Sequence, residues 1–143
     1  MNKWFVRLVV VGLVSLFAHQ ICLAGDLDVG VMWIGKSDMP KAIMKGMTTV
    51  LKEKAPDINM EFKIELANDA AAAPVYNDWQ TQKKAIVFLR SNGADYVKKN
   101  PSKIPVLIGG CNHPTQLDLI KNLDAPEGNI TGTTYYVSGE KKV

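Results

Sequence analysis

The chain has 143 residues, 47% of them hydrophobic, and carries 17 Lys and Arg against 14 Asp and Glu. Basic and acidic residues are interspersed over the whole length, without the basic patch and interleaved aromatic residues that nucleic-acid binders carry. The composition therefore argues against a nucleic-acid partner and is sufficient for one domain with a hydrophobic core.

The first 24 residues predict a secretory signal peptide with cleavage after Ala24. Two basic residues come first, residues 5–17 are almost wholly apolar, and a small-x-small site follows. The alternative is a retained membrane anchor, but the polar pair His19-Gln20 ends the apolar run before the ~20 residues that a span needs. Cys22 lacks the small residue that precedes a lipidated cysteine, so no lipid is expected there.

Export places the remaining chain, residues 25–143, in the periplasm as a single domain. Two of the 17 basic residues leave with the signal peptide, so 15 face 14 acidic ones, a formal charge of +1. Cys111 is then the only cysteine, which excludes an intramolecular disulfide in this oxidising compartment. It follows an apolar run, which favours a buried thiol over one that pairs between chains.

The first half of this domain predicts a strand, a helix and a second strand. Residues 27–34 form an apolar strand, and the loop 35–38 ends on residue types that cap helices. Apolar residues then recur every three or four positions until Pro56, which predicts an amphipathic helix of about four turns. Residues 59–66 alternate apolar and polar side chains, as a strand near a sheet edge does.

The middle of the chain predicts a helix followed by a buried strand. The four alanines at 70–73 are interpreted as a loop that enters a helix over 74–84, with Val75, Trp79 and Gln82 on one face. Residues 85–89 are continuously apolar, which is typical of a buried parallel strand.

The last third repeats this alternation. We expect a turn at 91–93 into a short helix over 96–99, then a strand over 104–108 that ends at a glycine pair. A helix over 115–122 and a strand over 130–137 follow. The buried side of that helix is predicted to hold Leu117, Ile120 and Leu123.

Strands and helices that alternate at this spacing predict the α/β class, an open parallel sheet with helices on both faces. Ligands of such sheets bind outside the carboxyl ends of the strands, where loops and helix amino ends meet. This places four segments on one rim: 33–38, 90–93, 109–114 and 133–136.

Two segments carry a resemblance to a known family. They are IPVLIGGCNHP at 104–114 and KNLDAPEGNITGTT at 121–134. In this order they resemble the N-terminal lobe of ABC-transporter substrate-binding proteins of the type I periplasmic-binding fold, in the branch of tryptophan and tyrosine binders.

The resemblance implies a bilobed protein that closes on a small solute and delivers it to a membrane permease driven by a separate ATPase. Such proteins are at least twice this length, so the chain is expected to be one lobe. It is then either a fragment or a half that works alone or as a dimer. An isolated lobe should expose apolar surface and self-associate.

Ser91, Asn92 and Gly93 are the first candidate ligand residues. Their hydroxyl, amide and backbone N–H groups follow a strand and begin a helix, so they could bind a carboxylate or another anion. Helix capping without a ligand would select the same residue types. Both interpretations stay open from the sequence.

Asn112 and His113 follow Gly109-Gly110, where absent side chains let a ligand approach the backbone. A tight turn without a ligand is the alternative. Both residues are therefore candidate ligand contacts.

Trp33 ends the first strand and is a candidate for stacking on the solute, although core packing explains it equally well. Thr133 is a further candidate on the rim. Tyr135 and Tyr136 point to opposite sides of their strand, so one of them faces the rim.

Nothing in the sequence predicts a catalytic residue, a metal or a cofactor. No Gly-x-Ser-x-Gly elbow accompanies His113. Cys111 and His113 have no second Cys/His pair to complete a metal site, and no glycine-rich nucleotide loop is present.

The sequence thus predicts a periplasmic solute-binding lobe of an ABC-type uptake system that binds an amino acid or related compound and is not an enzyme. The alternative is an exported sensing or interaction module of the same fold that feeds a membrane receptor. An exported hydrolase is a third, less favoured class.

Overall fold

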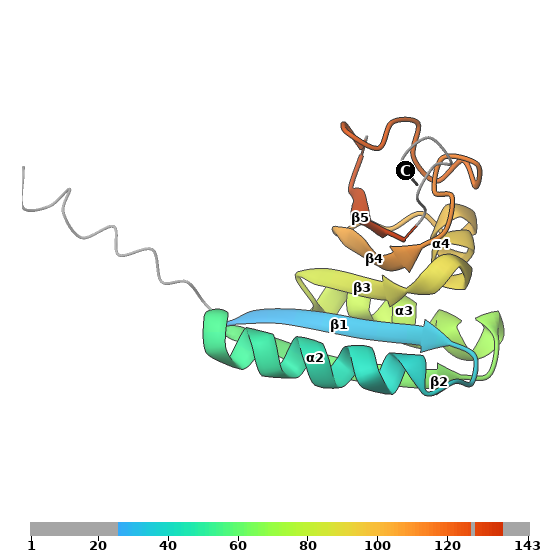
Figure 1. Cartoon of the computed structure of the whole chain (residues 1–143). Helices are drawn as coiled ribbons and strands as arrows, with labels where there is room; N and C mark the ends of the chain where they lie inside the picture. Colours follow the sequence, from blue (N-terminus) through green and yellow to red (C-terminus); the bar gives the residue numbers. More distant parts are fainter. Residues whose placement is uncertain (1–25, 127, 136–143) are drawn as a thin grey trace, which may run out of the picture.

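The computed structural model describes residues 26–126 and 128–135, so the predicted signal peptide lies outside the described residues. Within them, five strands form one sheet and helices pack on it (Figure 1). None of these helices is long and apolar enough to cross a membrane. The elements are β1 (Leu27–Ile34), α2 (Met39–Lys54), β2 (Ile58–Leu66), α3 (Asp69–Gln82), β3 (Ala85–Leu89), α4 (Arg90–Lys99), β4 (Val106–Cys111) and β5 (Ile130–Thr134).

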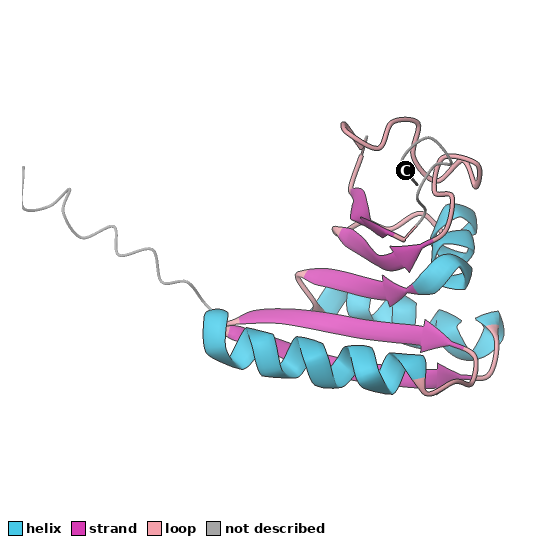
Figure 2. Cartoon of the chain, viewed as in Figure 1, coloured by secondary structure: helices cyan, strands magenta, loops and turns pink. Residues whose placement is uncertain are grey.

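The sheet has the order β2-β1-β3-β4-β5, and each neighbouring pair is parallel. The predicted α/β class is therefore confirmed, as is the placement of β2 at an edge. The chain enters the sheet at β1, adds β2 on one side and then β3, β4 and β5 on the other (Figure 2). The sheet order thus reverses direction between β2 and β3.

Helices cover both faces of the sheet, as predicted. On β1, Val31 and Trp33 belong to one core with side chains of α2, whereas Met32 and Ile34 belong to the other core. That second core is completed by α3 and α4, whose buried residues surround Phe88 of β3. Because successive side chains of a strand point to opposite faces, the sheet has a separate apolar layer on each face.

The predicted start of α3 is wrong. The four alanines are helical rather than a loop, and the helix contains Pro74. Asn68 caps it, because its side-chain Oδ1 accepts the N–H of Ala71 at 3.0 Å. Alanine is the best helix former, so a capped alanine run begins a helix without needing an apolar stripe. The predicted face is partly wrong too, since Gln82 is exposed and the buried residues are Ala72, Tyr76 and Trp79.

The predicted helix over 115–122 is also wrong, because this segment is a series of turns. Asp118 has φ +49, a left-handed conformation that no right-handed helix can contain. Lys98 holds the segment in place, since its Nζ donates to the carbonyl of Leu117 at 2.8 Å and lies 3.3 Å from Asp118 Oδ2. Of the three residues predicted to be buried there, Leu117 and Ile120 are half-buried and Leu123 is exposed.

Three other boundaries differ from the prediction. β4 covers Val106–Cys111 rather than 104–108, so the glycine pair lies inside the strand. α4 begins at Arg90, well before the predicted 96, because Gly93 and Ala94 pack against the sheet. β5 ends at Thr134, and the rest of its predicted range from 136 lies outside the described residues.

Candidate functional site

The carboxyl ends of β1 and β3 border a hollow of about 330 Å³. Three predicted ligand residues line it: Trp33, Ser91 and Asn92. Four predicted residues, Gly93, Asn112, His113 and Thr133, do not. The described residues that line it are Trp33, Ile34, Gly35, Lys36, Arg90, Ser91, Asn92 and Tyr135.

Ser91 connects the start of α4 to the end of β4. Its hydroxyl oxygen accepts the backbone N–H of Asn112 at 3.0 Å. Burial raises the pKa of the neighbouring Cys111 thiol, and the nearby Ser91 hydroxyl lowers this pKa by less. The thiol donates to the carbonyl of Asn112 at 3.4 Å. Cys111 is thus a buried thiol, as predicted, and stays protonated at neutral pH.

Asn92 and Gly93 hold α4 against the sheet. The Asn92 amide donates from Nδ2 to the carbonyl of Ile34, and its Oδ1 accepts the N–H of Gly93 at 3.1 Å. A Cβ on Gly93 would lie 2.5 Å from Cδ2 of Phe88, so packing alone requires a glycine there. The helix has Leu89 at its N-cap and no side-chain cap, so these residues position α4 rather than cap it.

Trp33 is both a core residue and a wall of the hollow. It is 2% exposed and packs with the α2 core. An ideal Cβ on Gly35 would lie 3.2 Å from Cζ2 and 3.6 Å from Cε2 of the indole. The six-membered ring of the indole therefore lies beside Gly35. The buried Nε1 has no hydrogen-bond partner among the described residues.

Asn112, His113 and Thr133 lie farther along the rim. Asn112 is exposed, and its side-chain amide makes no hydrogen bond within the described part of the chain. His113 has φ +52, and its carbonyl accepts the N–H of Leu117 in the following turn. Thr133 accepts the N–H of Gly110 at 3.1 Å through its hydroxyl oxygen. Of these three, the side chain of Asn112 is the one most available to a ligand.

Tyr135 supplies the aromatic side chain of the rim that the sequence left undecided. It is 56% exposed and lines the hollow, and its backbone N–H donates to the carbonyl of Cys111 at 3.3 Å. Tyr136 lies outside the described residues. Tyr135 is therefore the tyrosine that we place at the site.

Arg90 and Lys36 also line the hollow. Both lie in rim segments predicted from the sequence, but neither was predicted as a ligand residue. Arg90 directly follows β3 and has φ +67. The available signal was its position between a buried strand and a helix. Residues 91–93 were predicted as ligand residues instead, because their types commonly cap helices.

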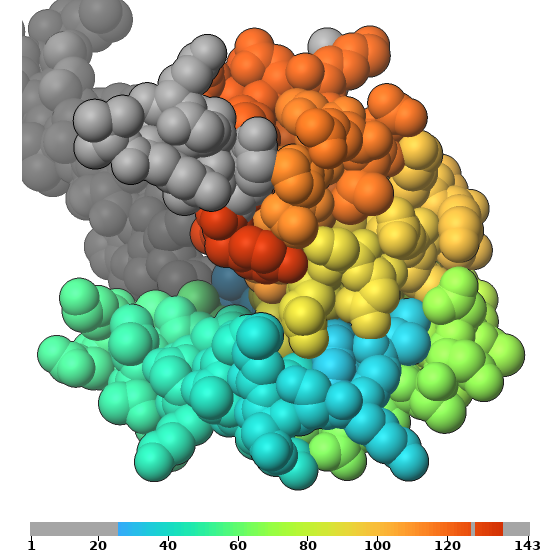
Figure 3. Space-filling view, turned by 45° about the vertical axis from the view of Figure 1, so that its right-hand side comes forward, coloured from blue at the N-terminus to red at the C-terminus, as the bar shows by residue number. Residues whose placement is uncertain are grey.

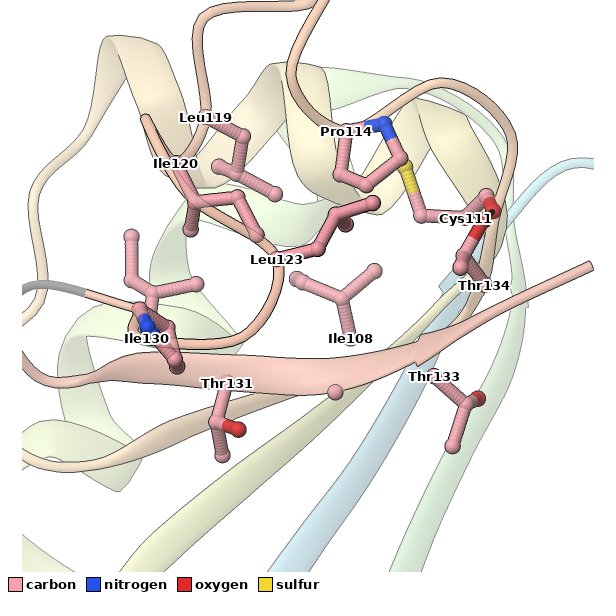
Figure 4. Close-up of a pocket in the computed structure, with 12 residues that line it drawn as sticks. Ile108, Cys111, Pro114, Leu119, Ile120, Leu123, Ile130, Thr131, Thr133 and Thr134 are labelled. Atoms are coloured by element: carbon pink, nitrogen blue, oxygen red, sulfur yellow. Dashed lines mark hydrogen bonds between the residues drawn. The ribbon is translucent and has the colours of Figure 1, made fainter. Parts of the chain in front are cut away.

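Other hollows lie elsewhere, and two of them border β4 and β5. One, of about 130 Å³, lies between the 113–126 segment and strands β4 and β5. Figure 4 shows that Ile108, Leu119 and Ile130 point into it, whereas the side chain of Thr133 points to the opposite face of the sheet. The second, about 430 Å³, runs between α2 and the part of β3, β4 and β5 that α2 does not cover (Figure 3). No group of three or more His, Cys, Asp or Glu that could hold a metal occurs among the described residues.

Comparison with known proteins identifies similar binding proteins. No family model matches the chain. It is 26% identical over 102 residues to a tyrosine-binding protein of Clostridioides difficile (strain R20291), a match that covers 68% of this chain and 30% of that protein.

Solved structures share the fold. An ABC domain from Streptococcus pneumoniae in complex with L-Trp superposes with a TM-score of 0.68 at 19% identity, covering 77% of this chain and 39% of that one. A ligand-free, open substrate-binding protein with adhesive properties from Clostridium difficile gives 0.68 at 20% identity, covering 80% and 41%. A conserved domain protein from Vibrio cholerae O1 gives 0.65 at 21% identity, covering 75% and 38%.

The chain spans well under half the length of each of these proteins. The predicted resemblance is thus confirmed, and the shared part fits one lobe of a substrate-binding protein.

Proposed function

We propose that this chain is a solute-binding lobe of an ABC-type uptake system, exported to the periplasm, and that it binds an amino acid or a related small solute. The observation that carries the proposal is the hollow of about 330 Å³ at the carboxyl ends of the strands. Its size and position fit a small ligand, since such sites measure about 300–1,000 Å³ and lie at strand ends in open parallel sheets. The tyrosine-binding relative and the L-Trp complex support the same class of solute.

The residues at the hollow favour binding over catalysis. Among the described residues that line it there is no histidine, aspartate or glutamate, the side chains that act most often as general bases. The nearby Cys111 is buried with a raised thiol pKa, which makes it a poor nucleophile. We therefore propose that the solute leaves the site unchanged.

The hollow is open on one side, so a second lobe would be needed to enclose the solute. We propose a membrane permease as the recipient of that solute. The groove beside α2 is lined by Ile43, Met47 and Leu107, of which Leu107 is 38% exposed. Uncovered apolar surface of this kind supports self-association of the isolated lobe.

Thermal unfolding of the purified protein with and without a panel of amino acids tests the proposal, with size-exclusion chromatography alongside. A ligand at ~100 times its dissociation constant adds about 2.7 kcal/mol to the free energy of unfolding. We expect aromatic amino acids to raise the melting temperature, and glycine to serve as the control that does not. A cooperative transition that no member of the panel moves would contradict the proposal.

A further inference from the structure

The two edge strands of the sheet differ in how well they are protected against pairing with another strand. β2, at one edge, carries the charged residues Glu61, Lys63 and Glu65. Its pairing with β1 shifts register near the rim, where Glu65 has φ +65 and the strand is bulged. Charges and bulges are devices that keep an edge strand from pairing with another chain. β2 is therefore a protected edge.

β5, at the other edge, lacks this protection. It has the sequence Ile-Thr-Gly-Thr-Thr, without a charge or a proline. Its register shift against β4 arises from an extra residue in β4, so β5 itself is not bulged. Four of its five residues are exposed, and for Gly132 the exposed atoms are those of the backbone, since glycine has no side chain. No strand of the described residues pairs with its outer side, so β5 is an open edge there.

The backbone of β5 directs hydrogen-bonding groups to this open side. The carbonyl of Asn129 accepts the N–H of Val106 at 2.8 Å, so that carbonyl faces β4. Backbone groups alternate along a strand, so those of Thr131 also face β4, whereas those of Ile130 and Gly132 point outward. An edge of this kind is a template for a further strand.

We propose that β5 pairs with β5 of a second copy of this chain, antiparallel and with Gly132 opposite Gly132. The N–H of each Gly132 then donates to the carbonyl of the other. Thr131 lies opposite Thr133 of the second copy, and their side chains lie on the same face of β5 (Figure 4). Thr–Thr pairs stabilise antiparallel strands, and no like charges meet. The strand is therefore complementary to itself.

An antiparallel pair of identical strands has a two-fold axis, which closed two-fold dimers, the commonest oligomers, also have. The sheets of the two copies become one continuous sheet. A contact made mainly by five residues from each copy is small, so we expect a weak dimer rather than a permanent one. The inference names a surface for self-association and does not depend on which solute the lobe binds.

Sedimentation velocity of the purified protein over a range of concentrations tests whether this dimer forms. We expect a monomer at about 1 µM and mostly dimer at about 500 µM, as a small interface predicts. A monomer at every concentration would overturn the inference. A series of larger aggregates without a defined dimer would do the same, because an antiparallel β5 pair leaves no β5 edge for a third copy.

Two double variants test the register, because they place charges at the two facing positions. Thr131→Lys/Thr133→Lys puts like charges opposite each other and should weaken the dimer at least about tenfold. Thr131→Lys/Thr133→Glu puts opposite charges there and should dimerise within about threefold of the parent. Both lose the Thr133 hydroxyl that accepts the Gly110 N–H, so they are matched for that loss. Equal dimerisation of the two variants would overturn the proposed register.

Two further variants separate the β5 edge from other causes of association. Asn77→Lys/Gln82→Lys adds the same charge at exposed positions of α3 and should dimerise as the parent does. Leu107→Gln alters the apolar groove beside α2, where Leu107 is 38% exposed, and should also dimerise normally. Loss of the dimer in Leu107→Gln, with an unchanged dimer in Thr131→Lys/Thr133→Lys, would assign the contact to the groove and overturn the inference.

Amide hydrogen exchange of the unmodified protein gives a test that needs no variant. Because the Gly132 N–H is donated across the dimer, its exchange should slow at least about tenfold as the protein goes from monomer to dimer. Fast exchange of Gly132 in the dimer would overturn the inference. Slow exchange at every concentration would overturn it too, because another segment of the same chain would then cover the edge.

Discussion

Asn92 and Gly93, at the start of α4, have structural roles that their residue types did not predict. Both were predicted from their types as anion-binding or capping residues. In the structure the amide of Asn92 is hydrogen-bonded to the carbonyl of Ile34, and Gly93 fits closely against Phe88. Sequence reasoning located a segment that borders the hollow, but packing decides which of its residues remain available to a ligand.

Replacement of Gly93 by alanine tests this packing. The new Cβ would lie 2.5 Å from the Phe88 ring, so the free energy of unfolding should fall by about 1–3 kcal/mol. Gly46→Ala is the matched control, because nothing lies within 4 Å of its Cβ and alanine favours the interior of α2. The control should gain about 0.5–1 kcal/mol. Urea denaturation measures both, and equal changes in the two variants would contradict the packing argument.

Of the residues that line the hollow, Trp33, Ser91 and Asn92 could be predicted because they lie at or just after the ends of buried strands. Arg90 and Lys36 belong to the predicted rim segments 90–93 and 33–38, but their residue types did not mark them as ligand residues. Charged residues after a strand are ordinarily solvated, so the sequence alone does not show that they border a hollow.

At the scale of elements, the spacing of apolar residues failed to predict the structure of two segments, α3 and residues 113–126. The alanines of α3 carry no amphipathic signal, yet the capped run is helical. Residues after Pro114 have apolar side chains at helical spacing, yet Asp118 adopts a left-handed backbone and the segment turns back instead. Capping and helix propensity decide the first case, and the backbone conformation of a single residue decides the second.

Removal of the α3 cap tests the first of these explanations. Asn68→Ala deletes the acceptor of the Ala71 N–H, so the free energy of unfolding should fall by about 1 kcal/mol. Asn68→Asp keeps an acceptor oxygen and should lose little. Asn77→Ala, an exposed change within the same helix, is the control and should stay within about 0.5 kcal/mol of the parent. A loss in Asn77→Ala as large as that in Asn68→Ala would contradict the capping role.

At the scale of the whole molecule, the alternation of strands and helices was sufficient to predict the sheet and the rim at which we propose that a solute binds. Five parallel strands with helices on both sides follow from apolar runs and amphipathic spacing. The order of the strands brings the ends of β1 and β3 together, and the rim forms there. The α2-side groove across β3, β4 and β5 could not be predicted, because it depends on which part of the sheet α2 leaves uncovered.

The central claim is that the rim of this lobe binds a small solute, and amide NMR spectra recorded during titration with L-tryptophan or L-tyrosine test it most directly. We expect the shifted resonances to cluster at 33–36 and 90–92, together with Tyr135 and the indole N–H of Trp33. Shifts confined to the groove residues Ile43, Met47 and Leu107 would place the ligand elsewhere. That result, or no shift with either amino acid, would contradict the account.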